Sequence, residues 1–152
     1  MCGACPGGAG ISRLSAYAAL AGIKADVARL LQQAAGRRVG IRAFGDQWVL
    51  TTRTGTQRVV PGLEEVAAAV VAGPLDWQAV SDLTGCPVTR DGAGLACAAG
   101  PALQQILDAP LHGPHPQVTA GEFTAALLVR AAGARTSSQA QPAPDSAGGM
   151  VR

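Results

Sequence analysis

Apolar side chains recur every three or four positions through the first third of the chain, as Leu14 and Tyr17 illustrate. This is the period of one face of an α-helix, so we expect helical structure from residue 11 to about residue 36. Gly22 predicts a bend or a break inside this stretch. Gly36 follows the last apolar positions and is typical of a helix C-terminus.

The pattern changes over residues 38–60, where apolar and polar positions alternate. Strict alternation is the mark of a half-buried β-strand, and glycines at 45 and 55 predict two turns. We therefore expect a three-stranded antiparallel meander, with Trp48 and Leu50 facing the core. The expected strands are residues 38–43, 47–53 and 56–60.

The remainder of the chain returns to helical patterning. The expected helices are residues 63–72, 74–84, 101–108 and 119–132. In the last of these, Thr119 is followed three positions later by Glu122, which predicts a capping box. These elements predict one α+β domain over residues 11–133: a helical N-terminal segment, the three-stranded meander, and several short packed helices.

Two terminal segments fall outside this domain. Residues 1–10 are rich in glycine and contain two cysteines, so we expect a flexible segment that can bind metal. Residues 134–152 have few large apolar side chains, and we expect a disordered tail.

Charge is distributed unevenly along the 152 residues, whose net charge is +2. Residues 1–60 carry eight basic and two acidic side chains, a net +6, whereas the rest carries four basic and eight acidic ones. A basic half favours phosphate or an acidic partner. No apolar run approaches the roughly 20 residues of a membrane-spanning helix. No secretory signal is recognised and cysteines are few, so we expect a cytoplasmic protein.

The candidate chemistry begins at Cys2-Gly3-Ala4-Cys5, because two thiolates at C-x-x-C spacing can bind one zinc ion. Two ligands do not complete a tetrahedral site. His112 and His115 would close a Cys₂His₂ site, and Cys86 with Cys97 would instead close a Cys₄ site. Both alternatives remain open from the residues alone. A thioredoxin-type redox pair lies between a strand and a helix, and no strand is predicted before Cys2.

Enzyme motifs are absent from the sequence: it has no phosphate-binding loop, no dinucleotide fingerprint and no nucleophile elbow. We therefore expect no catalysis. The predicted strands instead suggest a basic stripe that contacts RNA phosphates or another acidic partner. Its members are Arg37, Arg38, Arg42, Arg53 and Arg58. The aromatic pattern of a sequence-reading RNA domain is missing, and nothing predicts recognition of a DNA sequence.

The N-terminal C-G-x-C at Met1–Cys5, on a small Ala- and Arg-rich chain of actinobacterial appearance, resembles the mycobacterial recruitment factor for the long hibernation-promoting factor. The resemblance implies zinc binding by Cys2 and Cys5, a role in stress-induced ribosome hibernation, and the hibernation-promoting factor and the ribosome as partners. We therefore expect a non-enzymatic, zinc-responsive adaptor. The alternatives are a metal-free protein–protein interaction module and a small thiol redox protein that uses the N-terminal C-x-x-C.

Overall fold

The structure is a computed structural model and describes residues 12–89, 94 and 99–139. Six helices and three strands follow one another in the described part, which confirms the α+β class. The elements are α1 (Arg13–Leu20), α2 (Lys24–Ala35), β1 (Val39–Phe44), β2 (Gln47–Thr52), β3 (Gln57–Val60), α3 (Leu63–Val71), α4 (Trp77–Thr84), α5 (Ala99–Asp108) and α6 (Ala120–Gln139).

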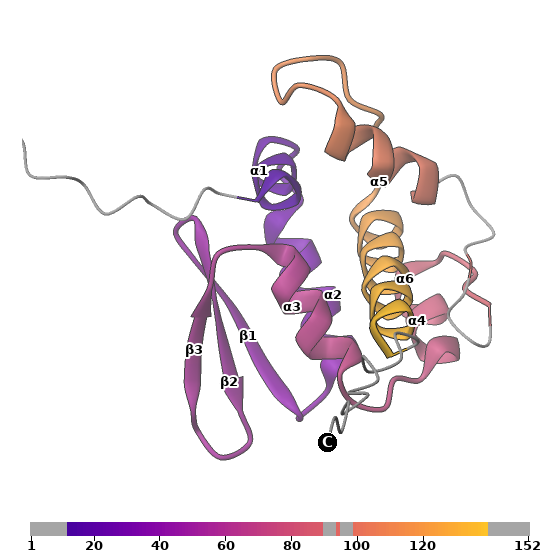
Figure 1. Ribbon diagram of the computed structural model, residues 1–152. Coiled ribbons are helices and arrows are strands. Elements are labelled where there is room, and N and C mark those ends of the chain that lie inside the picture. Colours follow the sequence, from indigo (N-terminus) through magenta and orange to yellow (C-terminus); the bar gives the residue numbers. More distant parts are fainter. Residues whose placement is uncertain (1–11, 90–93, 95–98, 140–152) are drawn as a thin grey trace, which may run out of the picture.

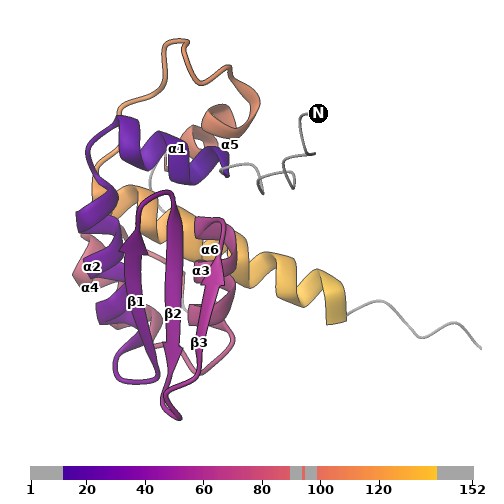
Figure 2. The same ribbon diagram turned by 90° about the vertical axis from the view of Figure 1, so that its left-hand side faces the viewer.

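The three strands form an antiparallel sheet in the order β1-β2-β3, as the alternating pattern predicts. Gly45 (φ 54°) and Gly55 (φ 82°) turn the chain between the strands, and both need the left-handed backbone that glycine adopts without strain. Figure 1 shows the helices on one side of the sheet. Figure 2 looks onto the opposite face, which no described element covers.

The core lies between the sheet and the helices. Ile41, Trp48, Leu50 and Val60 point from the sheet into this layer and are buried. The expected inward orientation of Trp48 and Leu50 is confirmed, because Trp48 is fully buried and Leu50 is 5% exposed. One face of the sheet thus forms part of the core, and the described elements leave the other face uncovered.

Helix α6 is the centre of the helical layer and contacts α2, α3, α4 and α5. Its residues 123–128 are all buried, so its first half is enclosed on every side rather than along one stripe. The predicted capping box is confirmed. The N–H of Thr119 donates to the Glu122 carboxylate (3.0 Å), and the N–H of Glu122 donates to Thr119 Oγ1 (3.2 Å).

The C-terminal end of α6 differs from the expectation. Residues 134–139, which sequence analysis assigned to a disordered tail, continue the helix to Gln139. Arg135 explains the difference, because its guanidinium donates to the carbonyl of Val71 in α3 (2.6 Å). The composition of residues 134–152 could not predict this contact, because its two residues are 64 positions apart in the sequence. No helix in the described ranges is both long and apolar enough to cross a membrane.

Candidate functional site

Several of the predicted arginines lie at one end of the sheet. Val39 pairs with Thr52, which places Arg38 and Arg53, one position beyond them, at the same end. Arg37 precedes Arg38 in the connection from α2, and Arg58 is the second residue of β3, shortly after the turn that contains Arg53. These arginines are far apart in the sequence, and their proximity follows from the strand register. We call Arg37, Arg53 and Arg58, all exposed, the basal arginines.

Arg38 has a structural role that the sequence did not indicate. Its guanidinium donates to the carbonyl of Val70 in the last turn of α3 (3.4 Å), next to Val71, the acceptor for Arg135. Helices end with unpaired carbonyls and a partial negative charge, and an arginine there stabilises them. Arg38 is half-buried in this position. It is therefore part of the scaffold rather than of a free basic surface.

The predicted arginine stripe does not run along one face of the sheet. Arg42 lies opposite Val49, which lies opposite Val59, and this row occupies the open face. Arg58 lies opposite Leu50, so its side chain leaves β3 toward the helical side. Successive residues of a strand point to opposite faces, and Arg42 and Arg58 belong to different rows. Arg42 is thus separated from the basal arginines.

Apolar side chains accompany Arg42 on the open face. Phe44 is 73% exposed and Val59 is 56% exposed, whereas most large apolar residues of the described chain are buried. A hollow of the surface is lined by Arg42, Phe44, Val49, Thr51, Gln57 and Val59, together with Ala43. The open face therefore presents a cation, an aromatic ring and two valines. Exposed patches of this composition are typical of surfaces that bind macromolecules.

The two histidines lie in the connection between α5 and α6. His115 packs edge-on against the ring of Tyr17, with centroids 5.6 Å apart, and its Nε2 lies 3.1 Å from the carbonyl oxygen of Leu111. Its Nδ1 is buried and has no hydrogen-bond partner. His112 is exposed in the same loop. His115 therefore packs with the aromatic cluster between α1 and α6, where Tyr17 also stacks on Phe123 at 5.7 Å.

Cys86 is the one predicted cysteine ligand that the structure describes. It is buried and disulfide-bonded, and a sulfur in a disulfide is not the thiolate that zinc requires. The Cys₄ alternative would need Cys86 in its reduced form and stays a prediction. Cys2, Cys5 and Cys97 lie outside the described residues. Within the described ranges, no group of three His, Cys, Asp or Glu side chains is placed to hold a metal ion.

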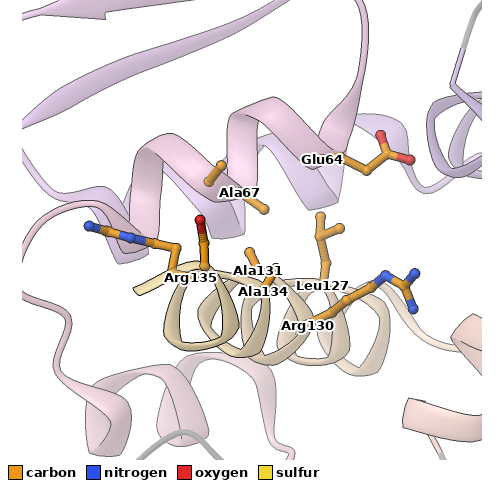
Figure 3. A pocket seen from close by; sticks show the side chains of 9 residues that line it. Glu64, Ala67, Leu127, Arg130, Ala131, Ala134 and Arg135 are labelled. Atoms are coloured by element: carbon orange, nitrogen blue, oxygen red, sulfur yellow. The ribbon is translucent and has the colours of Figure 1, made fainter. Parts of the chain in front are cut away.

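A groove between α3 and α6 was missed by the sequence reasoning. It has a volume of about 260 Å³ and a floor of small apolar side chains, among them Ala67, Ala131 and Ala134. Figure 3 shows Glu64 and Arg130 at one end and Arg135 at the other. The sequence signal that could have predicted this groove is the spacing of alanines three or four positions apart. Such spacing usually indicates close packing between helices instead. The groove suits one or two apolar side chains of a partner.

The comparisons with known proteins add no relative to this picture. No family model, no curated protein and no solved structure matches the chain.

Proposed function

We propose that this protein is a non-enzymatic adaptor that binds RNA phosphates through its basal arginines, with ribosomal RNA as the leading candidate. The supporting observation is that Arg37, Arg53 and Arg58 are exposed and form no ion pair with any acidic side chain that the structure describes. Among the described residues, the one ion pair joins Arg29 to Asp26 (3.5 Å). Arginines that the fold does not neutralise are available for phosphate.

The residues around Arg53 fit phosphate contact as well. Three threonines line the connection from β2 to β3: Thr52, the last residue of β2, and Thr54 and Thr56 in the turn. The hydroxyl of Thr54 lies 2.9 Å from that of Thr52 and 3.4 Å from that of Thr56. Hydroxyl groups and guanidinium groups are the common donors to phosphate oxygens. They read the backbone and not the bases, so the proposed binding does not depend on RNA sequence.

The test is salt-dependent binding of fluorescein-labelled poly(U) RNA and co-sedimentation with purified ribosomes. Replacing Arg37, Arg53 and Arg58 together by Gln should weaken binding. It should also reduce the slope of log affinity against log salt by about 2, at roughly 0.7 per phosphate contact on a single strand. Arg29→Gln is the matched control, because Arg29 is already paired with Asp26. Binding that is insensitive to salt, or to the triple substitution, would contradict the proposal.

The zinc response is a separate part of the proposal and concerns Cys2 and Cys5. We centre the zinc site on these two cysteines because Cys86 is in a disulfide and His115 packs against Tyr17. Two thiolates at C-x-x-C spacing suit zinc. In a glycine-rich segment, the free energy of zinc binding would also drive local folding around the metal. The resemblance at Met1–Cys5 supports the long hibernation-promoting factor as the protein partner and the cytoplasm as the compartment.

Zinc content per chain tests this part directly. Protein purified under reducing conditions should carry about one zinc per chain, and Cys2→Ser with Cys5→Ser should abolish it. Ser137→Ala is the control, because Ser137 is exposed and is not among the candidate zinc ligands. Absence of zinc from the wild-type chain, even after metal is added, would refute the zinc response. Rapid alkylation of Cys2 or Cys5 near neutral pH would instead favour a thiol redox protein.

A second candidate function is a metal-free protein–protein interaction module. The exposed Phe44 and Val59 on the open face favour it, and so does the apolar groove between α3 and α6. Retention of a protein partner after removal of zinc and at high salt would distinguish this function from the RNA-binding adaptor.

A further inference from the structure

The two edge strands of the sheet, β1 and β3, differ in whether their outward backbone groups are hydrogen-bonded. On β1, the side-chain amide of Gln32 donates to the carbonyl of Val39 (3.0 Å) and accepts from the N–H of Ile41 (2.6 Å). These are the groups that would otherwise pair with a neighbouring strand. Gln32 thus occupies the place of a fourth strand along the first half of β1, and α2, which carries it, packs beside that strand.

Within the described ranges, no side chain covers the edge formed by β3 in this way. The N–H of Thr52 donates to the carbonyl of Thr56 (2.9 Å), which identifies a hydrogen-bonded pair between β2 and β3. Bonded pairs alternate along an antiparallel ladder, so Arg58 also bonds to β2. The N–H and C=O groups of Gln57 and Val59 therefore point away from the sheet. In the described part of the chain they have no hydrogen-bond partner.

A second copy of β3 is a poor occupant of this edge. Three antiparallel registers would use the outward groups. The register centred on Arg58 places two arginines directly opposite each other, and like charges there are destabilising. The register centred on Val59 pairs Gln57 with Pro61, which has no N–H. The register centred on Gln57 extends into the turn at Gly55, whose φ is 82°.

We propose that the β3 edge binds an extended, acidic segment of a partner protein as a fourth strand. Main-chain hydrogen bonds to Gln57 and Val59 would hold the segment in place. Arg58 would lie in a non-hydrogen-bonded pair, where facing side chains are closest, so an Asp or Glu opposite it is favoured. An apolar residue of the segment would extend the row formed by Val49 and Val59 on the open face. The arginine that opposes self-pairing thereby selects an acidic partner.

This proposal goes beyond RNA binding and does not rest on it. Strand addition requires the backbone of β3, whereas phosphate contact requires only the arginine side chains. A proline at position 59 removes an outward N–H and leaves every basal arginine in place. Loss of strand binding with retained poly(U) binding would therefore separate the two activities.

The experiment selects binders from a random library of short peptides displayed on phage, with the full chain as bait. The selected peptides should alternate β-branched and polar residues and carry a central Asp or Glu. Val59→Pro should weaken their affinity at least about tenfold, the size expected from one lost main-chain hydrogen bond. Ala43→Pro is the matched control. It removes an outward N–H from β1, the other edge strand, and should leave affinity unchanged.

A second experiment tests the preference of Arg58 for an acidic residue in the bound peptide. Selection on Arg58→Glu should yield peptides with a central Lys or Arg in place of the acid. Amide exchange of wild-type Gln57 and Val59, followed by NMR, should slow when an acidic peptide binds, which tests strand addition without a proline substitution. Acidic peptides that bind Val59→Pro as tightly as wild type would reveal charge attraction alone and overturn the proposal. So would unchanged exchange at both amides.

Discussion

At the scale of single residues, Ser15 joins three parts of the core. Its side chain is buried, and its Oγ accepts hydrogen bonds from the indole N–H of Trp48 (3.3 Å) and the backbone N–H of Leu63 (3.1 Å). A serine in α1 thus satisfies one donor from the sheet and one from the start of α3. Buried donors without partners are costly, so this hydroxyl has more effect than its size suggests.

Ser15→Ala should lower the free energy of unfolding by about 2–4 kcal/mol, because it leaves two buried N–H groups without an acceptor. Urea denaturation followed by tryptophan fluorescence measures the change. Ser137→Ala is the control, since Ser137 is exposed and bonds only to a carbonyl of its own helix. We expect that control to change stability by less than about 0.5 kcal/mol. Equal effects of the two substitutions would contradict the role given to Ser15.

At the scale of elements, the two edge strands differ in their protection. Gln32 covers part of β1 through its side-chain amide, whereas β3 presents Gln57 and Val59 to the surroundings. Unpaired edges attract other strands, and proteins usually cover them or place charges on them. Here Gln32 covers part of one edge and the other edge carries Arg58, an arrangement that disfavours pairing between two copies of the chain.

Gln32→Ala should therefore have two effects. Stability should fall by about 1–2 kcal/mol, because the N–H of Ile41 and the carbonyl of Val39 lose their partner. The exposed β1 edge should also promote self-association at high protein concentration, which light scattering after size-exclusion chromatography would detect. Gln33→Ala changes the neighbouring exposed glutamine and should do neither. A monomeric Gln32→Ala variant of wild-type stability would show that the amide does not protect this edge.

At the scale of the whole molecule, α6 decides how closely the helical layer packs. A Cβ atom at Gly121 would lie 2.2 Å from the backbone oxygen of Thr84, at the end of α4. Backbone atoms cannot move aside as a flexible side chain can, so this glycine fixes the approach of α4 to α6. Gly133, further along the same helix, has no atom within 4 Å of an added Cβ.

The two glycines should consequently respond with opposite signs to substitution by alanine. Gly121→Ala should destabilise the fold by about 1–3 kcal/mol through overpacking. Gly133→Ala should stabilise it by roughly 0.5–1 kcal/mol, because glycine is the poorer helix former. Thermal unfolding of both variants gives the comparison. Stabilisation by Gly121→Ala would mean that α4 and α6 are further apart than the structure shows.

Local features of this fold were predictable from the sequence. The capping box at Thr119 and Glu122 requires only a spacing of three residues. The meander follows from alternation and from two glycine turns, and Trp48 and Leu50 face inward because neighbouring strand positions must face opposite sides. These predictions depend on backbone geometry over a few residues. They are correct because no distant contact opposes them.

The candidate sites were less predictable, because each depends on partners far along the chain. Arg38 and Arg135 both donate hydrogen bonds to carbonyls at the end of α3. The contact of Arg38 removes it from the basic surface, and the contact of Arg135 accompanies the extension of α6 to Gln139. Strand register decided that Arg42 and Arg58 lie on different rows. The sequence by itself determined the elements and their inward faces, through local periodicity. Only the tertiary structure decided which arginines are free and which sheet edge is open, because those properties depend on what packs against each group.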